Sequence, residues 1–176
     1  MRSKKPRPAG NAAAPGEIIA EIPVFRPIGR IRSPFTRPEQ TPIQPYRSQA
    51  AGRVEVLSQY EAGLQDLEGF SHIILVYHFH RAAAGYDLLV TPFLDDQPKG
   101  LFATRYPRRP NTIGLSVVRL IRREGLVLHV QGIDVLDGTP LLDIKPYVPA
   151  FDAFPEASSG WLEGRTANRR RDAPGP

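Results

Sequence analysis

Three arginines and an asparagine lie close together in residues 100–116, whose sequence is GLFATRYPRRPNTIGLS. They are Arg105, Arg108, Arg109 and Asn111. Prolines fix φ and glycines permit conformations that other residues avoid, so this segment is expected to hold one shape. Guanidinium groups on a rigid loop are suited to binding an anion or a polar ligand. A basic hairpin connection without a chemical role is the other interpretation of the segment taken alone.

Two further features could take part in chemistry. His80 follows a short apolar run, residues 73–77, that is predicted to be a buried strand. A histidine can exchange a proton near neutral pH, although one at the end of a strand can also serve only in packing or hydrogen bonding. Asp137 and Gly138 form a dipeptide typical of a tight turn. The turn can present backbone groups to a ligand, but the dipeptide alone indicates only a chain reversal.

The chain has 176 residues, of which 41% are hydrophobic, and this suits one folded domain with tails. We expect a disordered basic tail over residues 1–22, a folded domain over residues 23–162 and a second disordered basic tail over residues 163–176. No apolar run approaches the ~20 residues that span a bilayer. The N-terminal segment also lacks the apolar centre of a secretory signal. The sequence therefore predicts a cytoplasmic protein with no membrane partner.

The chain contains no cysteine, which excludes disulfides, cysteine-ligated zinc, iron–sulfur clusters and a cysteine nucleophile. Its four histidines show no recognised ligand spacing, so no metal is expected. The formal net charge of +5 is compatible with a polyanionic partner such as RNA, although many of the basic residues lie in the tails. No G-x-G-x-x-G motif follows a predicted strand, and a Rossmann-type cofactor site is therefore not expected.

Short strand signals follow one another closely between the tails. The predicted strands are residues 28–31, 53–56, 70–79, 86–92, 116–121, 126–131, 133–136 and 140–144. One helix is predicted over residues 58–68, with Ser58 as its cap, Leu64 and Leu67 on its apolar side, and Gly69 at its end. No long helices alternate with the strands, so a doubly wound sheet is not expected. The fold class predicted is mainly β: a small closed β-barrel with one short helix and disordered tails.

Five motifs occur in one order along residues 24–155. They are residues 27–35 (PIGRIRSPF), 41–44 (TPIQ), 63–72 (GLQDLEGFSH) with the strand that follows, 102–114 (FATRYPRRPNTIG) and 132–147 (GIDVLDGTPLLDIKPY). Any one of them alone would carry little information. Together they resemble the TsaA-like family, the tRNA N6-threonylcarbamoyladenosine N6-methyltransferases that include TrmO.

The resemblance implies a methyltransferase that uses S-adenosyl-L-methionine and is built on a β-barrel. It implies methylation of N6 of threonylcarbamoyladenosine at position 37 of tRNA, by a homodimer whose cofactor binds near the barrel end and the subunit interface. Carried over residue by residue, the cofactor contacts fall on Pro42, Ile43, Gln44, His80, Arg81, Arg109, Leu115, Asp137, Gly138, Thr139 and Pro140. These loops are expected to gather around a single pocket.

The resemblance also leaves choices open among these residues. Arg109 is the first candidate for the carboxylate of the cofactor, and a tRNA phosphate is the alternative. His80 is the candidate catalytic base. Substrate binding is expected of Arg105, Arg108, Lys145 and Tyr147, and Asp134 and Asp143 lie near the same turn and could also orient the substrate.

This sequence departs from the family pattern at two positions. Ile43 stands where arginine is common, so it could contact the cofactor only through its backbone or its apolar surface. Thr112 stands where proline is common, which loosens the arginine loop. Two other functions stay open at this point: a non-catalytic β-barrel that binds RNA or a nucleotide, and a methyltransferase that acts on another substrate.

Overall fold

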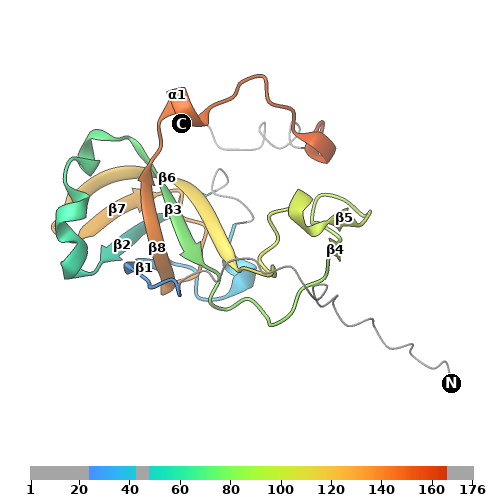
Figure 1. Ribbon diagram of the computed structural model, residues 1–176, viewed down its shortest axis with the longest axis horizontal. Helices are drawn as coiled ribbons and strands as arrows, with labels where there is room; N and C mark the ends of the chain where they lie inside the picture. Colours follow the sequence, from blue (N-terminus) through green and yellow to red (C-terminus); the bar gives the residue numbers. More distant parts are fainter. Residues whose placement is uncertain (1–23, 43–47, 166–176) are drawn as a thin grey trace, which may run out of the picture.

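Six antiparallel strands close into a barrel in the computed structural model, which describes residues 24–42 and 48–165 (Figure 1). Their order around the barrel is β1-β2-β7-β6-β3-β8. The strands are β1 (Gly29–Arg32), β2 (Ala51–Val56), β3 (His72–His78), β6 (Ile113–Glu124), β7 (Val127–Gln131) and β8 (Thr139–Pro146). This confirms the predicted fold class. Closure pairs every strand on both sides, so the sheet has no free edge.

The core of the barrel comes from the alternation of side chains along the strands. In β3, Ile73, Leu75 and Tyr77 are buried, and the residues between them face outward. The same period of two in β2 and β7 buries Val54 and Leu128 completely. Because successive side chains of a strand point to opposite faces, one face of each strand fills the barrel and the other is left for solvent or a partner.

The predicted helix over residues 58–68 is present as two 3₁₀ helices instead of one α-helix. They are η3 (Ser58–Leu64) and η4 (Leu67–Gly69). Leu57, not Ser58, occupies the N-cap position of η3, and no side chain caps it. Leu64 and Leu67 are buried against the core, as their apolar character predicted. The other short helices are η1 (Pro38–Gln40), η5 (Leu101–Ala103), α1 (Pro149–Asp152) and η6 (Gly160–Leu162).

Two strand predictions were wrong: one strand is much shorter than predicted, and the other segment forms no strand. Of residues 86–92, only Leu89–Val90 (β4) form a strand, paired with Lys99–Gly100 (β5). Residues 133–136 form none, although Ile133 and Val135 are buried in alternation. This segment connects β7 to β8, which lie on opposite sides of the barrel, so it must cross the barrel end.

Side-chain hydroxyl groups replace a partner strand along this crossing segment. Ser48 Oγ donates to the carbonyl of Ile133, and Ser33 Oγ donates to the carbonyl of Val135 at 2.6 Å. Both carbonyls lie beside a filled core, where an unpaired polar group would be costly. The segment therefore closes one end of the barrel as a plug.

The chain after β8 reaches over to the β4–β5 pair (Figure 1). Trp161 Nε1 donates to the carbonyl of Ala103 at 2.8 Å, and the nearly buried carboxylate of Asp95 pairs with Lys99 at 2.9 Å and with Arg165. The predicted tails fall outside the described residues except for 163–165. Within the described ranges, no helix has the length and apolar character needed to cross a membrane.

Candidate functional site

The loops that carry most of the predicted site residues leave one end of the barrel. At this end β1 and β3 finish and β6 and β8 begin. Two contacts tie neighbouring loops together: the Phe79 amide donates to the Thr112 carbonyl at 2.8 Å, and Arg81 Nη1 donates to the Thr36 carbonyl at 3.2 Å. The His80–Arg81 dipeptide therefore lies between the loop that follows β1 and the arginine loop that precedes β6.

The turn at Asp137 is fastened to the end of β1. Its amide donates to the Phe35 carbonyl at 2.7 Å, and its carboxylate accepts from the Ser33 amide at 3.1 Å and from Arg32 Nη1 at 3.3 Å. Gly138 has φ +76°, a left-handed conformation that glycine adopts without strain. The predicted chain reversal is present, and these bonds hold it in one position.

The two other residues of this turn motif begin strand β8. Thr139 is buried, and its hydroxyl donates to the Leu136 carbonyl at 2.7 Å. Pro140 lies opposite Arg30 in the ladder between β8 and β1. Both residues therefore fix the turn to the barrel wall.

The arginine loop is held mainly by contacts to backbone carbonyls. Arg109 Nη1 donates to the Thr104 carbonyl at 2.9 Å, and its guanidinium lies 5.7 Å from the centre of the Phe102 ring. Arg108 Nε donates to the Gly85 carbonyl at 3.4 Å. A guanidinium has five N–H donors, so one or two such bonds orient the group and leave donors for an anion.

His80 lies beside Arg81 at the exit of β3, with its amide bonded to the His78 carbonyl at 2.8 Å. Partial burial, together with the positive charges of Arg81 and His78, lowers the pKa of His80 below its usual value. The imidazole is consequently neutral at physiological pH, the form that accepts a proton. Leu115 lies on the outer face of β6 near the same end and is 53% exposed.

A buried polar network lies directly beneath this end of the barrel. Tyr77 and Ser116 share a hydrogen bond of 2.9 Å, and Ser116 Oγ donates to Asp134 Oδ1 at 2.6 Å. Burial raises the pKa of Asp134 to about 6, and the positive charge of Arg105 acts in the opposite direction. Burial and the Asp134 charge raise the pKa of Tyr77. The sequence placed Asp134 near the turn, but nothing in it linked this residue to Tyr77 and Ser116.

Gly114 makes the close packing of this network possible. A Cβ atom at this position would lie 2.1 Å from the Tyr77 ring and 2.9 Å from the Phe79 ring. These two rings also meet edge to face, with their centres 5.3 Å apart. The network therefore connects through Phe79 to the His80–Arg81 dipeptide.

Two predicted substrate residues lie at the opposite end of the barrel. Lys145 Nζ pairs with Asp143 at 2.8 Å, and the Tyr147 amide bonds to the His72 carbonyl at 3.1 Å. Six residues of strand at ~3.3 Å each separate Lys145 from Thr139 by about 20 Å. Within one protomer these two side chains are therefore remote from the Asp137 turn. Pro42 is half-buried after η1, and Ile43 and Gln44 lie outside the described residues.

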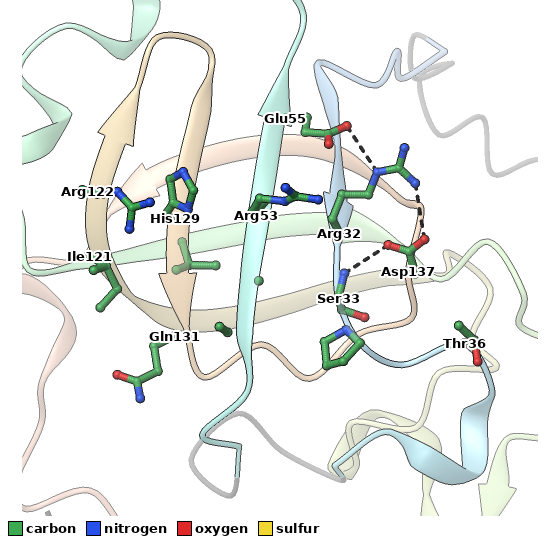
Figure 2. Close-up of a pocket in the computed structure, with 14 residues that line it drawn as sticks. Arg32, Ser33, Thr36, Arg53, Glu55, Ile121, Arg122, His129, Gln131 and Asp137 are labelled. Carbon is green, nitrogen blue, oxygen red and sulfur yellow. Dashed lines mark hydrogen bonds and ion pairs between the residues drawn. The ribbon is translucent and has the colours of Figure 1, made fainter.

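A groove of about 900 Å³ opens on the outer face of β1, β2, β7 and β6 (Figure 2). Ser33, Thr36 and Asp137 line it at one side, whereas Arg109 and His80 do not line it. The described residues thus place Asp137 and Arg109 at the same barrel end, and of these two only Asp137 lines the groove. No cluster of three or more potential metal-ligating side chains occurs among residues 24–42 and 48–165.

Residues 30–153 match the family model of the tRNA-methyltransferase O N-terminal domain. A probable S-adenosyl-L-methionine-binding protein of Pyrococcus abyssi is 54% identical over 140 residues, which cover 79% of this chain and 76% of the relative. The tRNA (adenine(37)-N6)-methyltransferase of Rattus norvegicus is 37% identical over 168 residues, covering 92% of this chain and 37% of the rat protein.

Solved structures show the same architecture. A crystal structure of TrmO superposes with a TM-score of 0.68 at 44% identity, covering 80% of this chain and 64% of that one. TrmO from Pseudomonas aeruginosa superposes with a TM-score of 0.65 at 41% identity, covering 80% and 63%. The chain thus spans a little less than two thirds of these structures. With its six-stranded barrel and the match over most of its folded region, this chain belongs to the tRNA-methyltransferase O N-terminal domain family.

Proposed function

We propose that this chain is an S-adenosyl-L-methionine-dependent methyltransferase that acts on tRNA, at N6 of threonylcarbamoyladenosine in position 37. The family match and the names of the relatives support this activity. The observation that carries it is the convergence, at one end of a closed barrel, of arginines, a neutral histidine and a partly buried carboxylate. The arginines and the carboxylate match a ligand that bears one negative and one positive group. The neutral histidine matches a reaction that releases a proton.

The residues present fit the methyl donor. Arg81 and Arg109 keep N–H donors for a carboxylate, and Asp134 is a poorly solvated carboxylate suited to a positively charged group. The rigid turn over residues 137–140 offers backbone groups for the nucleoside, and Leu115 offers an apolar surface. We include Pro42, Ile43 and Gln44 in the proposed site on the family resemblance. When bound, the cofactor supplies a methyl group on a positively charged sulfur.

His80 is the proposed base for the proton of the acceptor nitrogen. Its lowered pKa leaves the imidazole unprotonated at neutral pH, and its place between two loops directs it to the barrel end. Arg105 and Arg108 are proposed to hold the RNA beside it. Positioning of the two reactants and exclusion of water would supply much of the rate enhancement.

We propose a homodimer that forms through the outer face of β3 and β6. The register places Ile74 opposite Val117 and Val76 opposite Leu115, all on the outer face, and Ile113 next to them is 43% exposed. A continuous apolar stripe of this kind is typical of a surface that a second copy covers. Lys145 lies opposite Ile74 at the border of the stripe, and Tyr147 follows two residues later. A partner could therefore bring these two residues toward the other subunit's barrel end. With tRNA as substrate, the proposed compartment is the cytoplasm.

The test is methyl transfer from labelled S-adenosyl-L-methionine to purified tRNA that carries threonylcarbamoyladenosine, with unmodified tRNA as the control. We expect label only in the modified tRNA, located at N6 by mass spectrometry of its nucleosides. Label in both RNAs would indicate another methylation target. A thermal shift with the cofactor separates these outcomes from a non-catalytic RNA-binding barrel, which would show no shift and no transfer.

A further inference from the structure

We propose that the groove on the outer face of β1, β2, β7 and β6 is a track for the phosphate backbone of the tRNA, with Arg53 as its central contact. The inference rests on the proposed function and adds to it the surface along which the substrate lies. The track consists of a row of four basic side chains: Arg32, Arg53, His129 and Arg122.

The row is a consequence of strand register. Arg32 lies directly opposite Arg53, Arg53 opposite His129, and His129 opposite Arg122, so each of four adjacent strands contributes one basic residue (Figure 2). Neighbouring strands lie ~4.8 Å apart, so the row runs about 14 Å across the sheet. This length is greater than a single small anion needs and suits a chain of phosphates.

The surface beside the row is hollow where the outward-facing residue of β2, Ala51, is small. Ala51 and Gly52 line the groove together with the basic side chains, and they leave about 900 Å³ of open space. Gly52 contributes only backbone to the groove, because a Cβ atom at position 52 would point inward, 2.9 Å from the Arg32 carbonyl oxygen and 3.1 Å from the buried Ile133 side chain. The basic side chains therefore border a depression that a polymer can enter.

The charges of the row are unequally compensated. Arg32 is paired with Glu55 and Asp137, both at 3.3 Å, and Glu124 pairs with both Arg122 and His129. The Arg53 side chain, in the middle, makes no hydrogen bond or ion pair with any residue of the ranges 24–42 and 48–165. Like charges directly opposite each other destabilise a sheet. The Arg32–Arg53 pair is thus unfavourable to the folded chain alone and favourable once an anion lies between the two guanidinium groups.

The track ends at the candidate site. Arg32 contacts Asp137 at one end of the row, and Thr36 lines the same side of the groove. The Thr36 carbonyl in turn accepts a hydrogen bond from Arg81. Phosphate contacts fix the register of a nucleic acid, while the base is recognised elsewhere. Backbone held along this row would place a nucleotide at its end beside the proposed methyl-transfer site.

The test measures binding of an anticodon stem-loop RNA by fluorescence anisotropy between 50 and 300 mM KCl, using the full chain. We expect Arg53→Gln to weaken binding roughly three- to tenfold and to reduce the slope of log Kd against log salt by about 0.7 to 0.9, the value of one phosphate contact. Arg53→Gln with Arg122→Gln should reduce the slope by about twice that amount. In the methylation assay KM should rise while kcat at saturating RNA is unchanged.

Arg26→Gln is the matched control, because it removes the same charge from an exposed residue that does not line the groove. It should leave the slope unchanged. Arg53→Gln should be at least as heat-stable as the wild type, since it relieves repulsion within the sheet. Suppose that the unmutated chain binds and methylates tRNA and that both groove variants bind RNA with the same affinity and the same salt slope as that chain. This result would overturn the track and leave the proposed function intact. A wild-type chain that neither binds nor methylates tRNA would overturn the proposed function itself.

Discussion

Replacement of Asp134 by asparagine tests the buried network at the barrel end. Asparagine has nearly the same shape, and its Oδ1 can still accept the hydrogen bond that Ser116 donates at 2.6 Å. The variant therefore removes the negative charge and keeps the geometry. We expect it to be more stable than the wild type at alkaline pH and to lose most of that advantage in acid.

The size of the effect follows from the pKa of Asp134. Burial raises this pKa from 3.8 to about 6, so the fold favours the protonated carboxyl. The stability that the protonated carboxyl contributes to the folded state is complete below pH 3.8 and is lost as the pH rises through 6. At ~1.36 kcal/mol per pKa unit, the wild type carries a penalty of about 3 kcal/mol at pH 8 and about 1 kcal/mol at pH 4.5.

The assay compares thermal unfolding of Asp134→Asn and the wild type at the two pH values. The difference of about 2 kcal/mol corresponds to a gain in Tm that is roughly 4–8 °C larger at pH 8 than at pH 4.5. Asp143→Asn is the control, because Asp143 is 46% exposed, pairs with Lys145 at the surface and accepts a hydrogen bond from the Ile144 amide that asparagine can also accept. Its replacement should change Tm by less than about 3 °C at either pH.

An equal change in Tm at both pH values would refute this reasoning. It would mean that Asp134 does not hold its proton more tightly in the folded state, and that burial does not control its ionisation. A larger stabilisation at pH 4.5 than at pH 8 would show that the charge is favourable where it lies. In that case the influences that lower the pKa of Asp134, first the hydrogen bond from Ser116 and then the charge of Arg105, would outweigh burial.

Three further predictions concern the same region and the segment after β8. Gly114→Ala brings a methyl group against the Tyr77 ring and should lower the free energy of unfolding by about 1–3 kcal/mol in urea titrations; an unchanged midpoint would show that the ring can move aside. His80→Ala should slow single-turnover methylation about 100-fold or more while calorimetry shows little change in cofactor binding; equal losses would make His80 a binding residue only. Trp161→Phe removes the hydrogen bond to Ala103 and should cost about 1 kcal/mol, with faster hydrogen exchange in residues 93–103; unaltered exchange there would contradict a fastening role for the indole.

The barrel wall could be predicted largely from local patterns. Residues 73–77 form a continuous apolar run in the sequence and lie within β3, and the hairpin of β6 and β7 turns at Gly125, whose φ is +57°. Such features depend on neighbours along the chain, where side-chain period and glycine conformation act directly. Residues 133–136 carry the same alternation but form no strand. The alternation predicts only which side chains are buried. Here Ile133 and Val135 are buried because the segment closes the barrel end, not because it pairs with another strand.

The candidate site was predicted less completely, because its distances depend on the third dimension. Asp137 and Lys145 are eight residues apart in the sequence, yet an extended strand carries them to opposite ends of the barrel. Arg109 and Asp137 share an end of the barrel, but only Asp137 lines the groove on the outer face. Sequence motifs identify the chemical groups, whereas the direction of each strand decides which groups can meet.

By itself, the sequence determined the class of fold, the family and the loops that carry reactive groups, since apolar alternation, turn residues and ordered motifs are local properties. Only the tertiary structure decided that Tyr77, Ser116 and Asp134 share a buried network and that Arg32, Arg53, His129 and Arg122 stand in one row. The row comes from four strands whose register is set by barrel closure. Pairing between distant strands brings its members within a few ångströms of one another, and no spacing along the chain encodes that proximity.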